Sequence, residues 1–125
     1  MSDDTVTTRS GSIHLREDGI LCFRALPGVE QDEQEALHNL EASRQLAGGR
    51  CVPVLVDMRE IAPMTRGARV AYARAEFASA QALVVGSPFT RIVANLFLKV
   101  GRPERPARMF TSEQEAIRWL LKTAA

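Results

Sequence analysis

The alternation of apolar and polar residues near the start of the chain predicts a β-hairpin. Residues 12–17 (SIHLRE) and 20–26 (ILCFRAL) have strand character, and Asp18-Gly19 between them is a dipeptide typical of tight hairpin turns. The second run is apolar on both faces, which favours a central strand that is covered on both sides. We therefore expect the first strand to lie antiparallel at an edge of the sheet.

The rest of the chain alternates between short apolar runs and helical periodicity. Runs typical of buried parallel strands occur at VPVLVDM (52–58), ALVVG (82–86) and ARMF (107–110). Helices are predicted within residues 31–49, 65–80, 87–102 and 111–123. The order β-β-α-β-α-β-α-β-α predicts an α/β fold with a mainly parallel five-stranded sheet covered by helices. Residues 12–123 are expected to form this single domain, and residues 1–11 a flexible polar tail.

Helical spacing also predicts which side chains face the sheet. The expected inward residues are Leu37, Leu40 and Ala47 in the first helix, Val70, Ala73 and Phe77 in the second, and Phe89, Ile92, Val93, Leu96 and Val100 in the third. Thr65 and Ser87 stand where helix N-caps are expected, and Pro88 follows Ser87 at the first helical position, where proline is preferred.

The third helix is apolar around most of its circumference. At about thirteen residues it is too short for the roughly 20 that a membrane span needs. The apolar residues that fall outside its expected inward stripe are Ala94, Phe97 and Leu98. With Lys99 and Arg102 they form a candidate surface for a partner protein, a second copy of the chain, or a lipid.

Composition and charge indicate which classes of function are favoured for this chain. The 125 residues carry a net charge of +1, with one Trp and one Tyr, which does not favour nucleic-acid binding. The charge is uneven, because residues 1–63 sum to −5 and residues 64–125 to +6. The chain starts without a signal-peptide pattern, and Cys22 and Cys51 are far apart in apolar surroundings, so we expect reduced thiols and a cytoplasmic location.

The carboxyl ends of the predicted parallel strands are where a ligand site is expected. Asp57, Thr65 and Ser87 lie at or just after these ends, and three arginines lie within a turn or two of them: Arg66, Arg69 and Arg91. The group could bind a phosphate or carboxylate at helix N-termini, or a hydroxyl there could be phosphorylated. The alternative is that Thr65 and Ser87 are ordinary caps, and that Asp57 accepts hydrogen bonds from its own loop.

Motifs for catalysis, metal binding and nucleotide phosphates do not occur in the sequence. His14 and His38 are isolated and lack the spacing of metal ligands. We therefore expect a protein that is not an enzyme and that carries no metal and no cofactor.

Three segments carry a resemblance to a known superfamily: VLVDMREIAPMTRGAR, SPFTRIVANLFLKVGRP and ARMFTSEQEAIRWL. Together with the order of elements, they resemble the SpoIIAA-like proteins, which include the STAS domains of anti-sigma factor antagonists, and in particular small stand-alone bacterial STAS-like proteins of unassigned function. In the antagonists, a serine at the start of the helix after this strand is phosphorylated. Thr65 is similar to that serine in position, although this chain has Met64-Thr65-Arg66-Gly67 where antagonists usually have Asp-Ser before a glycine.

Two functions are consistent with these features. The first is a regulatory protein-interaction module of the STAS type, acting in the cytoplasm and expected to form a homodimer. The second is a carrier of a small apolar ligand or lipid, which would associate peripherally with an anionic membrane through the apolar helix at residues 88–100.

Overall fold

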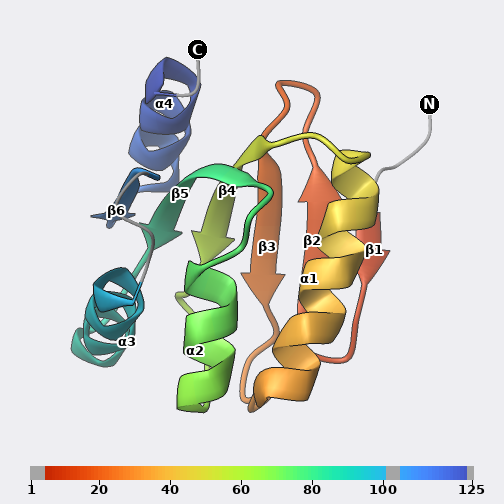
Figure 1. The fold of residues 1–125 in the computed structure, drawn as a ribbon. Coiled ribbons are helices and arrows are strands. Elements are labelled where there is room, and N and C mark those ends of the chain that lie inside the picture. The colour runs from red at the N-terminus through yellow and green to blue at the C-terminus, as the bar shows by residue number, and fades with distance from the viewer. Residues whose placement is uncertain (1–4, 101–104, 124–125) are drawn as a thin grey trace.

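The computed structural model describes residues 5–100 and 105–123, which form one six-stranded sheet and four helices (Figure 1). The strands are β1 (Thr5–Thr7), β2 (Gly11–Leu15), β3 (Leu21–Ala25), β4 (Val52–Asp57), β5 (Ala78–Val84) and β6 (Ala107–Phe110). The helices are α1 (Glu33–Ala47), α2 (Arg66–Ala73), α3 (Pro88–Lys99) and α4 (Glu113–Thr123). The mixed α/β fold predicted from the sequence is confirmed.

The strands stand in the sheet in the same order as in the sequence. β1, β2 and β3 are antiparallel neighbours, and β3 to β6 run parallel to one another. The acidic first half of the chain therefore lies toward the β1 edge, and the basic second half toward the β6 edge. The charge difference along the sequence becomes a charge difference across the molecule.

The sheet has one strand more than expected. β1 comes from the segment assigned to a flexible tail, and its residues pair with Ser12, Ile13 and His14 of β2. β1 is thus the antiparallel edge strand, whereas the edge position was predicted for β2. The three residues of β1 are too few for their alternation to be recognised, and only the open edge of β2 makes them a strand.

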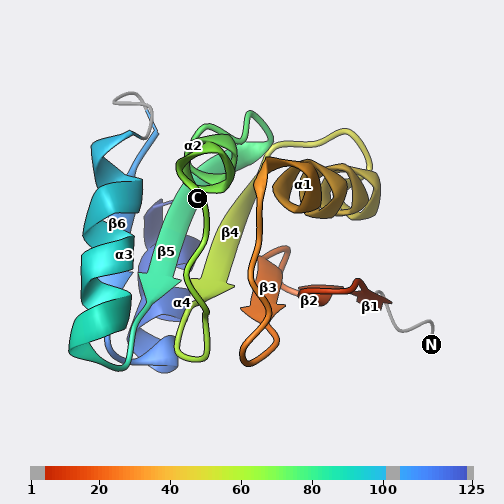
Figure 2. The same ribbon diagram turned by 90° about the horizontal axis from the view of Figure 1, so that it is seen from below.

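Helices cover both faces of the sheet unequally. The larger core cluster joins α1, α2 and α3 to one face, and a smaller cluster packs α4 on the other face against β4, β5 and β6. Figure 2 shows α1 and α2 on one side of the strands and α4 on the opposite side. In the smaller cluster, Leu55, Ala82 and Leu120 are almost completely buried.

Two helices differ from the sequence-based prediction, α2 in where it ends and α1 in which residues face the core. α2 ends at Ala73, and β5 begins at Ala78, so Phe77 follows the helix instead of facing inward from it. The alanine-rich residues 78–82 favour a helix, but strand pairing on both sides overrides that local preference. In α1, Ala47 is buried as expected, but Leu37 is exposed, and Ala36, Asn39 and Ser43 face the core instead.

The predicted caps are confirmed by hydrogen bonds. Thr65 Oγ1 accepts from the backbone N–H of Ala68 at 3.2 Å and starts α2. Ser87 Oγ accepts from the N–H of Thr90 at 3.1 Å, while Thr90 Oγ1 accepts from the N–H of Ser87 at 2.9 Å. This reciprocal pair is a capping box at the start of α3, with Pro88 at the first helical position.

Candidate functional site

The outer face of α3 is the most conspicuous apolar surface that a single helix presents in the described part of the chain. Phe89, Ile92 and Leu96 are 43%, 60% and 39% exposed and lie on one stripe of the helix. The opposite face carries Ala94 and Phe97, which are buried in the larger core cluster.

This arrangement confirms the prediction for α3 at Val93 and Val100, which lie in or against the larger core cluster, and contradicts it for the other residues of the expected inward stripe. Ala94 and Phe97 were expected on the interaction surface but are 0% and 3% exposed, while Phe89, Ile92 and Leu96 were expected to cover the sheet. Leu98, also expected on that surface, is half-buried against the core, and Arg102 lies outside the described residues.

Thr90 gives the physical reason for the reversal. Its hydroxyl bonds the backbone N–H groups of Gly86 and Ser87 at 3.0 and 2.9 Å, which buries the Thr90 side of the helix. Because residues four and seven positions later share that side, Ala94 and Phe97 are carried into the core. The capping-box spacing of Ser87 and Thr90 was the sequence signal that could have oriented the helix.

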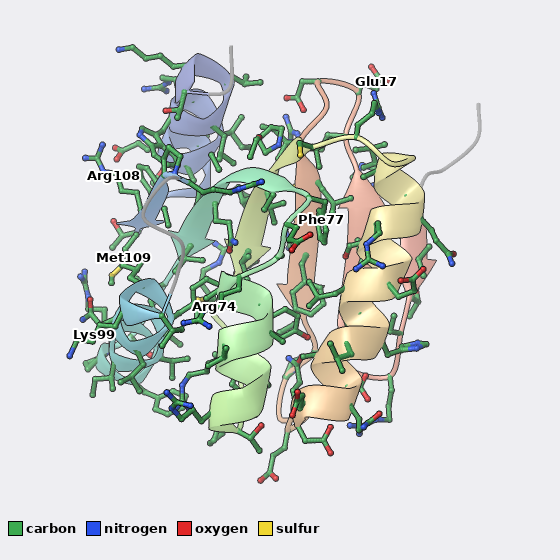
Figure 3. The ribbon with its side chains drawn as sticks, viewed as in Figure 1. Glu17, Arg74, Phe77, Lys99, Arg108 and Met109 are labelled. Carbon is green, nitrogen blue, oxygen red and sulfur yellow. The ribbon has the colours of Figure 1, made fainter. Side chains whose placement is uncertain are left out.

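Basic side chains border the outer face of α3. Lys99 follows Leu96 by one turn and extends away from the molecule (Figure 3). Arg91 is exposed and directly precedes Ile92 in the sequence. On the other side of the helix, Arg74 of α2 donates from Nε to the backbone oxygen of Val100 at 2.9 Å, which ties the end of α3 to α2. The result is an apolar stripe with a cationic margin on a helix held at its end.

Asp57 is the centre of a charge network at the carboxyl end of β4. Arg59 donates to both of its carboxylate oxygens at 2.9 and 2.8 Å, and Arg24 of β3 approaches Asp57 at 3.4 Å. Both arginines also reach Glu113, the first residue of α4, at 3.0 and 3.5 Å. The network therefore connects α4 to the ends of β3 and β4.

Electrostatics favour the charged form of Asp57. Burial alone would raise the pKa of this carboxyl, but the hydrogen bonds from Arg59, together with the charge of Arg24, lower it below its usual value. The same contacts raise the pKa of the Arg59 guanidinium. Asp57 is thus an ionised anchor between two arginines. It was expected either in an anion site or as an acceptor from its own loop, and the second expectation is confirmed by Arg59, whose backbone N–H donates to Asp57 Oδ1 at 3.1 Å.

The remaining residues of the expected anion site do not form one cluster. Within the described ranges, no hydrogen bond or ion pair joins Asp57 to Thr65 or Ser87, or to any of Arg66, Arg69 and Arg91. Arg69 instead donates to the backbone oxygen of Met64 at 2.9 Å. The Ser87 hydroxyl is occupied within the capping box.

Thr65 is exposed at the mouth of a surface hollow of about 700 Å³ between the starts of α1 and α2. Glu30 and Asp32 line the same hollow. Arg9 lines it as well, so the charged side chains of the hollow are of both signs.

Gln31, which lines this hollow, belongs to a group of hydrogen-bonded polar residues that was not predicted from the sequence. Gln31, Asn39 and Tyr72 form hydrogen bonds to one another between α1 and α2, and Gln31 and Asn39 are buried. The available signal was Asn39 with Ser43, two polar residues four apart at positions on the inward stripe of α1.

In the ranges 5–100 and 105–123, no group of three or more His, Cys, Asp or Glu side chains is placed to hold a metal ion. None of the helices described there combines the length and the apolar character that crossing a bilayer requires.

Comparisons with known proteins identify relatives but no activity. A family model described as "Domain of unknown function (DUF7793)" matches residues 13–124. An uncharacterised protein of the DUF3478 family from Shewanella loihica PV-4, with a SpoIIAA-like fold, is 17% identical over 96% of this chain and 98% of its own, with a TM-score of 0.62. A protein with unknown function from Arthrobacter sp. FB24 is 36% identical over 94% of this chain and 98% of its own, with a TM-score of 0.33. No curated protein matches.

The likeness to the Shewanella protein shows the fold. The chain has a SpoIIAA-like fold, and the resemblance seen in the sequence is confirmed at that level.

Proposed function

Because the chain belongs to the DUF7793 family, which is described only as a domain of unknown function, we propose a role from its surface: a non-enzymatic, regulatory module that binds a partner protein through the outer face of α3. The observation that carries the proposal is the exposed apolar stripe of Phe89, Ile92 and Leu96. Three large side chains on one helical stripe present an apolar area on the order of a few hundred Å², the size at which a patch on a monomer is often functional.

The margin of this stripe indicates the chemistry of the partner. Arg91 and Lys99 flank the apolar residues, and the surrounding half of the chain, residues 64–125, has a net charge of +6. A partner segment with apolar anchors and acidic neighbours complements this surface, for example an amphipathic helix laid along α3. Two copies meeting through the same face would bring like charges together, which makes a homodimer the weaker form of the proposal.

The polar residues at the carboxyl ends of the parallel strands support a role without catalysis. Asp57 is held between Arg24 and Arg59, and the hydroxyl of Ser87 is held by Thr90. A nucleophile next to a general base, the arrangement expected of a hydrolytic or transfer site, is not formed by these groups. Their hydrogen bonds are accounted for by the cap and by the attachment of α4.

Regulation of the module is proposed at Thr65. Thr65 is an exposed residue at the start of α2, and α2 packs against α3. A phosphate there would add negative charge to a hollow that Glu30 and Asp32 line together with Arg9, and it would thereby change how the starts of α1 and α2 lie against each other. Native mass measurement of protein purified from its own cells, with peptide mapping, tests this; a chain that is always unmodified at Thr65 contradicts it.

The interaction proposal is tested with charge substitutions on α3. We would purify the full chain with Ile92→Glu and Leu96→Glu together, and use Leu37→Glu as the matched control, because Leu37 is equally exposed but lies on α1. Proteins that co-purify with the wild type and the control should be lost with the α3 variant. A purified candidate should then bind the wild type and the control with the same Kd, and the α3 variant at least about tenfold more weakly.

Other outcomes of these experiments would show what binds the outer face of α3. A stable dimer of the wild type that the α3 variant dissociates would assign the face to a second copy and refute the acidic partner. Unchanged co-purification and an unchanged association state in the α3 variant would refute the proposal altogether.

The second candidate function is peripheral attachment to an anionic membrane. The observation that favours it is the same apolar stripe with Lys99 and Arg91 at its margin. Sedimentation with vesicles of phosphatidylcholine and phosphatidylglycerol at low salt tests it. Binding that disappears with added salt and with the α3 variant supports this candidate, and no binding at low salt rejects it.

A further inference from the structure

The sheet has an edge strand on each side, and these two strands are β1 and β6. Among the described residues, each pairs with one neighbour only, β1 with β2 and β6 with β5. Figure 1 shows them on opposite sides of the molecule. An edge strand presents backbone N–H and C=O groups with which a strand of another chain can pair. Both edges are therefore candidate sites for an added strand.

The hydrogen bonds to β5 show which residues of β6 face outward. The backbone oxygens of Pro106 and Phe110 accept from N–H groups of β5 and of the residue that follows it, at 3.0 and 2.9 Å. In a parallel ladder, the backbone groups of successive residues point alternately to the two sides of the strand. The N–H and C=O groups of Ala107 and Met109 therefore point away from β5, toward a strand that is added at this edge.

The outer side of β1 follows from its hydrogen bonds in the same way. The N–H of Thr8 donates to the backbone oxygen of Gly11 at 2.8 Å, next to the antiparallel ladder between β1 and β2. Because alternate residue pairs of such a ladder are hydrogen-bonded, Val6 bonds to β2, and the N–H and C=O groups of Thr7 point away from β2. Thr7 is exposed, so a strand that approaches this edge meets its backbone groups.

The two edges belong to parts of the chain with opposite charge. Arg108 is exposed in β6 and takes part in no ion pair with another described residue. Figure 3 shows Arg108 and Lys99 along the same margin of the molecule. β1 follows directly after Asp3 and Asp4 in the sequence, in the half of the chain that sums to −5, whereas β6 lies in the half that sums to +6. The β6 edge of one molecule therefore complements the β1 edge of another.

We propose that copies of this chain associate head to tail, with the β6 edge of one copy paired to the β1 edge of the next. Within one copy, β1 and β6 run in the same direction, because β1 and β3 are both antiparallel to β2 and β3 to β6 are parallel. A second copy in the same orientation therefore continues the sheet with a parallel pair of strands. Because the two paired edges differ, each end of the assembly keeps one open edge, and a series of copies results.

Contacts between two edges of the same kind are disfavoured by their charges. Pairing β6 with β6 would bring Arg108 of one copy next to Arg108 of the other, and pairing β1 with β1 would bring together two segments that follow Asp3 and Asp4. Like charges on neighbouring strands destabilise the pairing. The head-to-tail contact avoids both, and because it depends on opposite charges it should weaken as salt is added.

Sedimentation equilibrium of the full chain tests the contact. Because both strands are short, the association is weak, and protein concentrations from about 10 μM to about 1 mM are needed. At about 20 mM NaCl, where charges are little screened, the average mass should rise with concentration and exceed that of a dimer. At about 500 mM NaCl the apparent Kd should be at least about tenfold weaker.

Proline variants locate the contact at the two edges. Thr7→Pro and Met109→Pro each remove an outward N–H and keep the hydrogen bonds to the neighbouring strand, because these residues point away from it. Each should weaken self-association at least about tenfold. The matched controls are Thr7→Ala and Met109→Ala, which lose the same side chains but keep the N–H, and they should associate as the wild type does.

A mixture of the two proline variants distinguishes a head-to-tail contact from other modes of association. Thr7→Pro keeps an intact β6 edge, and Met109→Pro keeps an intact β1 edge. An equimolar mixture should therefore form a dimer of one copy of each variant and nothing larger, although neither variant associates alone.

Three results overturn the proposal: a wild type that stays monomeric at low salt over the whole concentration range, proline variants that associate as the wild type does, or a proline variant that dimerises by itself. If a proline variant does not fold, Arg108→Glu takes its place and should weaken self-association at least about tenfold, since it removes the positive charge of β6. All these variants leave the apolar stripe of α3 unchanged, so a partner protein that binds α3 should bind them as it binds the wild type.

Discussion

Replacing Phe97 by alanine, with Ile92→Ala as its counterpart, tests which face of α3 is packed. The two residues lie on opposite sides of the same helix, with Phe97 3% and Ile92 60% exposed. Both changes keep the helix propensity high, because alanine is the best helix former. Any large difference in stability therefore reports on packing.

The expected magnitudes follow from burial. Phe97 belongs to the larger core cluster, and deleting a buried phenylalanine side chain costs about 3–5 kcal/mol, since the cavity that remains adds to the lost transfer free energy. Full burial of an isoleucine stabilises by about 1.5–3 kcal/mol, and less than half of Ile92 is covered, so Ile92→Ala should cost about 1 kcal/mol or less. No cavity forms at an exposed position.

Urea unfolding followed by circular dichroism measures both variants against the wild type. Equal slopes with urea concentration show that the midpoints can be compared as free energies of unfolding. The difference between the two variants should be about 2–4 kcal/mol, with Phe97→Ala the less stable. If Ile92→Ala costs as much as Phe97→Ala or more, α3 packs through its other face, and the proposed binding surface on α3 is refuted.

Three further predictions concern the sheet and its charges. Asp57→Asn should lower the free energy of unfolding at pH 7 by about 1–3 kcal/mol, because Arg24 and Arg59 lose a charged acceptor. The folded pKa of Asp57 lies below the unfolded one, so this contribution is complete above about pH 4 and is lost as the pH falls through the folded pKa. The urea midpoints of the variant and the wild type should therefore converge in acid. Gly11→Ala should destabilise by about 1–3 kcal/mol in the same assay, since an added Cβ would stand 2.6 Å from the backbone oxygen of Arg24, and a variant as stable as the wild type would contradict the β2–β3 pairing. Cys22 should react with iodoacetamide at pH 8 much more slowly than the exposed Cys51, because burial raises the pKa of the Cys22 thiol to about 11, and mass spectrometry of the alkylated peptides would show the contrary order if that reasoning is wrong.

The charge network of Asp57 illustrates a contribution that local sequence could not predict. Arg59 is two residues away and was a foreseeable partner, but Arg24 and Glu113 come from distant parts of the chain. They meet because β3 and β4 are parallel neighbours whose carboxyl ends lie together, and because α4 starts at the same end of the sheet.

The local features of this protein could be predicted from the amino-acid sequence alone. The Asp18-Gly19 turn, the N-caps at Thr65 and Ser87, and the run of apolar residues in β4 depend on a few adjacent residues, and each was predicted correctly. The alternation of strands and helices followed from these features, and so did the fold class.

Contacts between distant parts of the chain determine which helix faces are buried and how far strand pairing extends. On α3 apolar residues occur all round, so periodicity allowed two orientations, and the buried hydroxyl of Thr90 selected the one that covers Phe97 and exposes Ile92. β1 became a strand only because β2 offered an open edge, and the helical preference at Ala78 gave way to pairing with β4. Local preferences amount to less than 1 kcal/mol per residue, whereas burial and strand pairing involve partners far along the chain, and the larger, non-local free energies prevail.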